Sequence, residues 1–263
     1  MISKAKIKYI QSLARKKKRT TERVFVAEGP KVVGDLLSVL PALAVFATSD
    51  WMDDHHHQCG QRAELTEVTN EELRRISFLQ HPQEVLAVFP QFTDKTDKSA
   101  VSTHLTIALD GIQDPGNLGT IIRIADWFGI TDIFCSLDTA DIYNPKVVQA
   151  TMGSIARVNI TYTDLPQFID SLPANVPIYG TLLDGKNLYN ETLSTTGLIV
   201  MGNEGNGISS EIRRRITHRL LIPNYPQGRE TAESLNVAIA AAITCSEFRR
   251  RQMPRTKQIK GIK

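Results

Sequence analysis

Apolar residues gather along the chain in short runs separated by polar segments, a rhythm typical of strands and covering helices. In the first part, such runs predict strands at residues 24–27, 42–47 and 84–89. Apolar residues at helical spacing predict a helix over residues 30–40. We therefore expect the amino-terminal part to form a small α/β domain.

A polar segment, residues 91–104, interrupts this rhythm, with few large apolar side chains and no clear periodicity. This composition favours a linker. We therefore predict four parts: an amino-terminal domain (1–92), a linker (93–103), a second domain (104–252) and a basic tail (253–263).

The second domain alternates strongly between apolar runs and helix-like stretches. The predicted strands are residues 105–109, 132–136, 158–162, 177–182, 198–201 and 219–222. Buried parallel strands with helices between them produce this pattern. The predicted fold class is α/β, with a parallel sheet in the second domain and a smaller α/β domain before it.

Three helices of the second domain have readable ends. After the first strand, one apolar stripe is formed by Leu118, Ile121, Ile122, Ala125 and Phe128. Asn117 can cap the start of this helix, Gly129 can end it, and Arg123 lies off the stripe. Asn144 and the proline after it predict the start of a second helix. The last helix is expected over about residues 232–251.

Composition places few limits on function. The 263 residues are 41% hydrophobic and 22% charged, the values of an ordinary soluble protein. The longest run of small apolar residues, 237–245, is too short to span a bilayer, and the amino terminus lacks a secretory signal pattern. Three distant cysteines argue against a disulfide framework and suit packing in a reducing compartment. The expected location is the cytoplasm.

The net charge of +3 is mild, but lysine and arginine crowd both ends of the chain. Such clusters attract phosphates, although a basic run is often only a solvated tail. The run from Lys257 to Lys263 is interpreted as a loose tail. The three consecutive histidines before Gln58 suggest a metal site, but neighbouring residues do not easily converge on one ion. A surface loop is the favoured interpretation, and no metal is predicted.

Three loops follow predicted strands, at the edge where open α/β sheets bind ligands. They are residues 110–129, 202–209 and 222–243. The second, GNEGNGIS, lacks the Gly-Lys-Ser/Thr of a phosphate-binding loop and the acidic residue of a dinucleotide site. Glycines in quick succession nevertheless allow a tight turn or a close approach to the main chain.

In this order, the three loops resemble the signature of the SpoU, or TrmH-like, family of RNA 2′-O-ribose methyltransferases within the SPOUT superfamily. The first motif is matched by Asn117, Gly119 and Arg123, and the second by Gly202, Glu204, Gly205 and Gly207. The third is matched by Ile222, Pro223, Ser234, Leu235, Asn236 and Val237. In the first domain, the segment FVAEGPKVVGDLL resembles a ribosomal-protein-like RNA-binding module.

This resemblance implies S-adenosylmethionine as cofactor, a trefoil knot in the parallel sheet, a homodimer, and RNA, ribosomal rather than transfer RNA, as substrate. It implies catalytic roles for Asn117, Arg123, Glu204, Ser234 and Asn236. It implies cofactor contacts at Thr181, Gly202, Gly205, Ile222 and Leu235. The alternative function is an RNA-binding or assembly protein with the same fold and no turnover.

The residues alone leave simpler roles open for this set. Arg123 could pair with Asp126 three positions later on a solvated helix face. Asn117 could be only a helix cap, and Ser234 and Asn236 could be caps of the last helix. Glu204 could bind main-chain N–H groups of its own loop or face Arg123.

Two segments depart from the family pattern. The turn between Pro223 and Ser234 is several residues longer than usual, so Arg229 could add RNA contacts. Glu84 stands where relatives commonly have glycine. Neither departure removes a motif residue.

Overall fold

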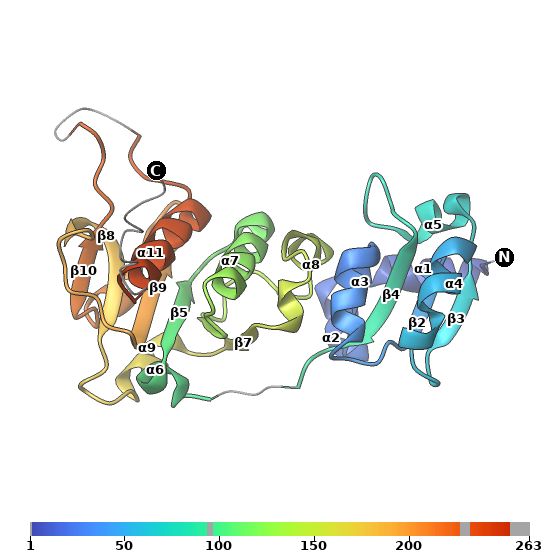
Figure 1. Cartoon of the computed structure of the whole chain (residues 1–263), viewed down its shortest axis with the longest axis horizontal. Helices are drawn as coiled ribbons and strands as arrows, with labels where there is room; N and C mark the ends of the chain where they lie inside the picture. The colour runs from blue at the N-terminus through green and yellow to red at the C-terminus, as the bar shows by residue number, and fades with distance from the viewer. Residues whose placement is uncertain (1, 94–96, 227–231, 253–263) are drawn as a thin grey trace, which may run out of the picture.

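Two β-sheets, one in each half of the chain, organise the computed structural model, which describes residues 2–93, 97–226 and 232–252 (Figure 1). The first sheet has the order β1-β4-β2-β3. Its strands are β1 (Val24–Glu28), β2 (Ala44–Ala47), β3 (Glu64–Glu67) and β4 (Val85–Pro90). β4 is antiparallel to both neighbours, whereas β2 and β3 are parallel.

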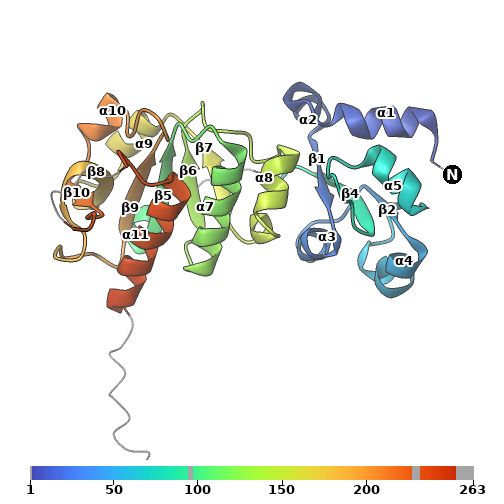
Figure 2. The same cartoon turned by 90° about the horizontal axis from the view of Figure 1, so that it is seen from above.

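Helices cover both faces of this first sheet (Figure 2). Alternate strand residues point to opposite faces, as the pleat requires. Phe25, Val45 and Ala87 pack toward α3 (Pro30–Leu37) and α4 (Ser49–His55). On the other face, the strands pack toward α1 (Lys4–Ser12) and α5 (Asn70–Ile76). The predicted small α/β domain is therefore present in the structure.

Several elements of the first unit were not predicted, among them α1, α2 and β3. The basic run at the amino terminus forms α1 and α2 (Lys16–Glu22), with Ser3 capping α1 and Ile10 buried. The solvated tail that charge alone would favour for this run is therefore absent, and the run is helical. β3 escaped prediction because its residues are mostly exposed and it holds one large apolar side chain, Leu65. Sheet-edge strands of this kind carry little hydrophobic signal.

The second sheet has six parallel strands in the order β10-β8-β9-β5-β6-β7. They are β5 (Leu105–Asp110), β6 (Asp132–Cys135), β7 (Asn159–Tyr162), β8 (Ile178–Asn187), β9 (Gly197–Gly202) and β10 (His218–Leu221). All six predicted strands are thus confirmed, and so is their parallel arrangement. The knot implied by the resemblance stays a prediction.

Strand register brings two of the motif loops together. β5 pairs with β9 so that Leu109 lies opposite Met201 and Asp110 opposite Gly202. The chain leaves both strands at this same edge. The loop after Asp110 and the glycine-rich loop after Gly202 are therefore neighbours before any side chain is considered.

Two long helices, α7 (Pro115–Trp127) and α11 (Val237–Gln252), pack against each other on one face of the second sheet (Figures 1 and 2). The remaining helices are α6 (Ala100–Thr103), α8 (Pro145–Ala150), α9 (Leu165–Asp170), α10 (Ser210–Arg213), and the 3-10 turns η1 (His56–Gln58) and η2 (Ser154–Ala156). α6 lies inside the segment predicted as a linker. Among the described residues, no helix is long and apolar enough to cross a bilayer.

The helix ends confirm some predictions and correct others. Asn144 caps α8, and Gly129, at φ +63°, follows the end of α7, as expected. Asn117 does not cap α7. That cap is Asp114, whose Oδ1 accepts from the backbone N–H of Asn117 at 2.8 Å. The Asp-Pro pair starts this helix by the same cap-then-proline logic that predicted Asn144.

Two further interpretations change. The last helix begins at Val237, five residues later than predicted, so Ser234 precedes it. The three histidines belong to the end of α4 and to η1 rather than to a loop. His55 stacks on Trp51 at 4.8 Å between ring centroids. Within the described ranges, no group of three potential ligands is arranged to hold a metal ion.

Other sequence features find a direct structural reason. Cys59, Cys135 and Cys245 are free and buried, which confirms that they are packing residues. Glu84 has φ +49°, a left-handed conformation that favours glycine. The glycine common at this position in relatives therefore suits the backbone, and Glu84 adopts the same conformation.

The two units share a buried seam. Arg19 of α2 is only 2% exposed, and its guanidinium donates to the carbonyls of Leu13 and Ala14 and pairs with Asp141 of the second unit. Beside it, the Tyr143 ring lies 5.0 Å from that of Phe25. Val148 and Ile155 of the second unit belong to the apolar core formed by β1, α3 and β4.

Candidate active site

Side-chain hydrogen bonds link the loops after β5 and β9 close to the points where they leave the strands. The carboxylate of Asp110 accepts from the backbone N–H of Ser209 at 2.7 Å. The amide of Asn203 donates to the carbonyl of Gly111, also at 2.7 Å. These bonds tie the first and second motif loops into one rigid edge of the sheet.

The glycine-rich loop closes on itself after Gly202. The backbones of Asn203 and Gly207 exchange two hydrogen bonds of 2.9 Å, and Gly207 has φ +68°. A Cβ at position 202 would lie 2.3 Å from the backbone of Gly207 and Ile208. Only glycine permits this approach at position 202, and the left-handed conformation at position 207 also favours glycine.

Asn203 holds the turn and was not among the predicted site residues. Its Oδ1 accepts from the backbone N–H groups of Gly205 and Asn206 at 2.9 and 3.0 Å. An asparagine just before a tight turn is a recognised sequence signal for this bond. Asn203, rather than Glu204, therefore binds the main chain of the loop.

A hydrogen-bonded relay joins one residue from each of the three motifs. Asn117 Nδ2 donates to Glu204 Oε1 at 2.9 Å, and Asn236 Nδ2 donates to Asn117 Oδ1 at 2.9 Å. Asn236 Oδ1 in turn accepts from the N–H groups of Ala238 and Ile239 at the start of α11. The expectation that Asn236 caps the last helix is confirmed, and Glu204 faces Asn117 rather than Arg123.

A cavity of about 440 Å³ lies beside this relay, within the usual range for small-molecule sites. Seven predicted site residues line it: Thr181, Gly202, Glu204, Gly205, Ile222, Ser234 and Leu235. Apolar walls come from Met201, Ile208, Leu220, Val237 and Ala240. Polar and charged side chains also line it, among them Asp184, Glu204, Arg213 and Glu233, so the cavity can bind a ligand that has both polar and apolar parts.

Arg123 is one of three predicted residues that do not line this cavity; the other two, Asn117 and Asn236, belong to the relay beside it. Arg123 lies exposed on α7, two turns beyond Asn117, and forms no hydrogen bond or ion pair with another described residue. The alternative pairing with Asp126 is wrong, because Asp126 is bound by Ser154 and Arg157. An exposed guanidinium without an acceptor is available to an anionic ligand.

The basic cluster at the end of the chain is partly used internally. Arg249 donates to the carbonyls of Phe128 and Gly129 at the end of α7, at 2.7 and 2.9 Å. Arg250 and Arg251 both pair with Glu247. Arg249 therefore ties α11 to α7, whereas Arg250 and Arg251 form ion pairs within α11. Arg229 and the predicted tail, residues 253–263, lie outside the described residues.

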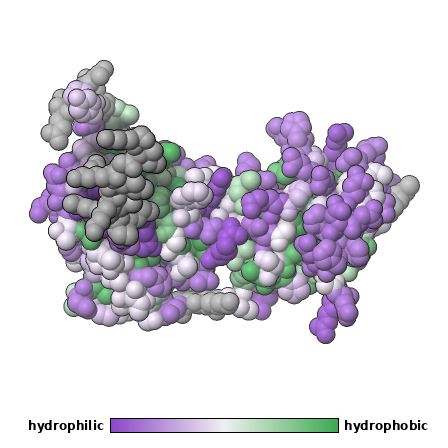
Figure 3. Space-filling model, viewed as in Figure 1, coloured by the Kyte–Doolittle hydropathy of each residue, from purple (hydrophilic) through white to green (hydrophobic). Residues whose placement is uncertain are grey.

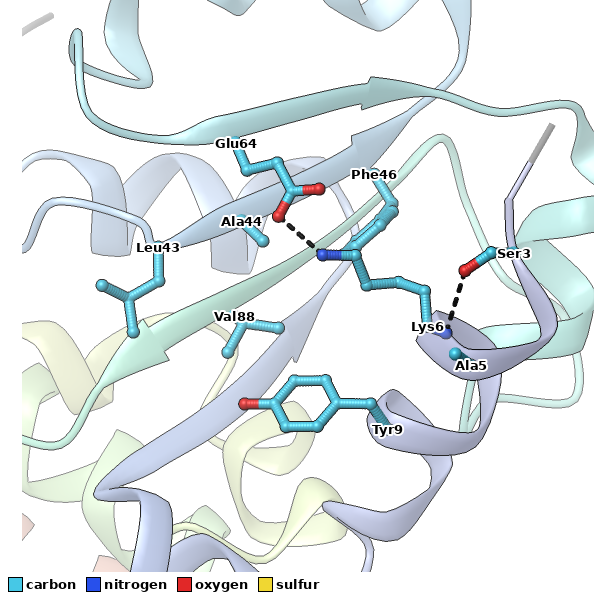
Figure 4. Close-up of a pocket in the computed structure, with 9 residues that line it drawn as sticks. All are labelled: Ser3, Ala5, Lys6, Tyr9, Leu43, Ala44, Phe46, Glu64 and Val88. Carbon is cyan, nitrogen blue, oxygen red and sulfur yellow. Dashed lines mark hydrogen bonds and ion pairs between the residues drawn. The ribbon is translucent and has the colours of Figure 1, made fainter.

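A second cavity, of about 540 Å³, lies in the first unit between α1 and the sheet (Figure 4). Lys6 reaches across it to Glu64, with 2.6 Å between Nζ and Oε2. The ammonium of Lys6 lies 5.9 Å from the ring centre of Phe46, and that of Lys18 lies 5.8 Å from the ring centre of Tyr9. Aromatic faces and cations thus surround one opening.

Comparison with known proteins identifies the class first. The model of the SpoU rRNA methylase family matches residues 104–246, and that of the MRM3-like substrate binding domain matches residues 4–87. The two matches coincide with the two sheets of the structure. The chain belongs to the SpoU rRNA methylase family.

Individual relatives cover almost the whole chain. The 23S rRNA (guanosine(2553)-2′-O)-methyltransferase RlmP of Bacillus subtilis is 29% identical, over 93% of this chain and 96% of its own. A structure assigned to the TrmH family of RNA methyltransferases, from Porphyromonas gingivalis, is 40% identical, with a TM-score of 0.84 over 95% of this chain and 99% of its own. The AdoMet-bound rRNA methyltransferase of Sinorhizobium meliloti is 29% identical, with a TM-score of 0.83 over 97% of both chains.

Proposed function

We propose that this protein transfers a methyl group from S-adenosylmethionine to the ribose 2′-hydroxyl of a nucleotide in structured RNA, with ribosomal RNA favoured over transfer RNA. The observation that carries this proposal is the relay of Asn117, Glu204 and Asn236 beside the cavity. It joins three separate motifs into one arrangement. The named activities of RlmP and of the Sinorhizobium enzyme support the same reaction.

The cavity is the proposed donor site. Gly202, Gly205, Ile222 and Leu235 expose main-chain groups along one wall, and Thr181 adds a hydroxyl. When bound, S-adenosylmethionine supplies a methyl group on a sulfonium, which needs no further activation. The remaining tasks of the protein are to align the ribose and to stabilise charge as its hydroxyl loses a proton.

Arg123 is the proposed catalytic residue for that charge. A guanidinium keeps its proton at neutral pH and rarely acts as a base. It can stabilise the emerging alkoxide or clamp the phosphate beside it. Asn117 and Asn236 hold Glu204 at the edge of the donor site, and Ser234 lines the same cavity.

We also propose that the protein acts as a homodimer through α7 and α11. Two large apolar side chains are exposed on these adjacent helices, Trp127 at 84% and Ile239 at 52%. Hydrophobic surface also appears over the second unit near α11, whereas the visible face of the first unit is mainly hydrophilic (Figure 3). Because Arg123 lies on α7 outside the cavity, a second copy would complete the surroundings of the acceptor.

A surface substitution tests the dimer. Trp127→Glu places a charge in the proposed interface, so we expect a monomer that binds the donor but transfers little methyl. Light scattering reports the mass, and calorimetry reports donor affinity. A monomeric wild-type protein with full transfer would contradict the dimer.

The first unit, residues 1–92, is the proposed RNA-binding domain, and residues 104–252 the transferase domain. The cavity between α1 and the sheet offers the ring of Tyr9 for stacking, and one lysine, Lys6, lines it (Figure 4). We propose that it accepts an unpaired base, since stacking contributes about 1–3 kcal/mol per base. Tyr9→Ala should then raise the KM for RNA about fivefold or more, whereas the exposed Tyr189→Ala should not.

Mapping ribose methylation tests the reaction itself. Total RNA from cells that contain or lack this protein is compared nucleotide by nucleotide. In cells that lack the protein, we expect one or a few 2′-O-methyl positions to disappear from ribosomal RNA. The proposed place of this reaction is the cytoplasm. Unchanged methylation, together with RNA binding by the purified protein, would favour the alternative of a non-catalytic RNA-binding or assembly protein.

A further inference from the structure

Arg157 lies between two carboxylates that belong to different units of the chain. Its Nη2 is 2.8 Å from Oδ2 of Asp126, and its Nη1 is 3.0 Å from Oδ2 of Asp35. Asp126 belongs to α7, the helix that carries Arg123, whereas Asp35 belongs to α3 of the first unit. The arginine therefore links the first unit to the helix of the proposed catalytic residue.

The carboxylate of Asp126 is fully engaged. Arg157 Nε donates to both of its oxygens, at 3.2 and 2.9 Å, and Ser154 Oγ donates to Oδ2 at 2.7 Å. Partial burial raises the pKa of Asp126, but the bonds from Arg157 and Ser154 outweigh it and hold the pKa below its usual range. Asp126 thus stays ionised and occupied.

Without these partners, Asp126 would be open to a cation of its own helix, although Lys31 of the first unit also acts on its charge. Asp126 lies three positions after Arg123, the spacing at which opposite charges on a helix pair. Yet Arg123 has no hydrogen bond or ion pair to any other described residue. The two arginines therefore compete for one carboxylate, and the structure shows Arg157 holding it.

We propose that Arg157 is a positioning residue that keeps Asp126 occupied and so leaves the guanidinium of Arg123 free for RNA. This inference rests on the proposed function, because Arg123 must be free only if it meets the acceptor nucleotide.

The turn that carries Arg157 is itself fixed against the first unit. Gly153 has φ +93°, and a Cβ at this position would lie 2.1 Å from Oδ2 of Asp35. The carboxylate of Asp35 therefore occupies the space above the turn and binds Arg157 from the other side. Arg157 is held by two carboxylates at once, which limits the orientations it can adopt.

A rescue experiment tests the proposal. In Arg157→Gln the released Asp126 captures Arg123, and kcat/KM for methyl transfer should fall about threefold, in line with an exposed ion pair. In the double variant Arg157→Gln, Asp126→Asn, no carboxylate remains at position 126 to capture Arg123. Activity should therefore return to within about 1.5-fold of the wild type, a smaller difference than the loss of one exposed ion pair would cause. Arg157→Lys, which keeps a cation beside Asp126, should retain most activity.

The outcomes separate this role from a merely structural one. If the double variant is as slow as Arg157→Gln, or slower, the proposal is wrong, because a structural defect would persist or grow. Asp35→Asn removes the ion pairs of Asp35 with Arg157 and with Lys31 but leaves Asp126 bound, and it should leave transfer within about twofold, the weak end of an exposed ion pair. If Asp35→Asn lowered methyl transfer as much as Arg157→Gln does, the cause would be the lost contact between the two units rather than the capture of Arg123. Failure of the proposed function would differ from all of these, since the wild type itself would transfer no methyl to ribose.

Discussion

Arg19 and Arg123 are the same residue type in opposite situations. Arg19 lies in the seam between the two units, where its guanidinium donates hydrogen bonds to two carbonyls and to Asp141. Arg123 lies exposed on α7 with no acceptor among the described residues. A buried arginine held by three acceptors maintains the structure, whereas an exposed and unpaired one is available for a ligand. The seam and the catalytic helix should therefore respond differently to mutation.

The seam should show the largest effect. Arg19→Met leaves Asp141 without its partner, and breaking a buried pair costs about 3–5 kcal/mol of unfolding free energy. Urea denaturation measures the loss. The double variant Arg19→Met, Asp141→Leu should recover most of it, because an apolar pair needs no counter-charge. Equal stability of wild type and Arg19→Met would show that the seam pair is not structural.

The catalytic helix should show the reverse pattern. Arg123→Ala should lower methyl transfer about 10²- to 10³-fold, the loss of one charge-stabilising donor. Unfolding free energy should change by less than about 0.5 kcal/mol, as for most surface substitutions. Arg214→Ala, an exposed arginine of the same unit, is the matched control and should leave both quantities unchanged. Unaltered turnover in Arg123→Ala would remove this residue from the mechanism.

Sequence predicted the two regions to different extents. The six parallel strands were predictable because buried strands are continuous apolar runs, as at residues 198–201. Arg123 could be singled out because it matches the first motif of the family, and it also lies off the apolar stripe of its helix. The role of Arg19 could not be predicted, since its acceptor, Asp141, is 122 residues away and burial of an arginine leaves no local pattern.

The site shows the same division. The glycines and the motif spacing are local signals, so the loop and seven residues lining the cavity were predicted. The pairing of Asn117 with Glu204 depends on strand register, which the sequence does not display. Asn117 was also mistaken for a cap because Asp114, three residues earlier, competes for that role and precedes a proline.

Substitution in the glycine-rich loop that lines the donor site should have a more moderate effect, on donor affinity. Gly202→Ala introduces a Cβ 2.3 Å from the backbone of Gly207 and Ile208, so the loop must move. We expect donor affinity, measured by calorimetry, to fall about tenfold, which corresponds to the lower part of the cost of overpacking. Gly205→Ala is the control, since its Cβ would meet only Asn203 Oδ1 at 3.6 Å. Equal losses in both variants would contradict the role assigned to Gly202.

The smallest expected effect lies at the far end of α11. The bond from Arg250 lowers the pKa of Glu247 to about 2, although burial opposes the shift and Arg251 adds to it. A carboxylate whose pKa is lowered on folding stabilises the fold at pH values above its ordinary pKa of 4.5. This contribution to stability is lost as the pH falls toward 2. Because Arg250 is largely exposed, Glu247→Gln should cost only about 1 kcal/mol at pH 7. The two proteins should converge at about pH 2 in thermal unfolding, and a constant difference would contradict this linkage.

The donor site itself is the centre of the account, and a crystal structure with S-adenosylhomocysteine, the demethylated product, tests it most directly. We expect the product in the cavity between the glycine-rich loop and the turn after β10, with its adenine against the main chain of Gly202, Ile222 and Leu235. Electron density for the product at another site, with this cavity empty at saturating concentration, would contradict the account.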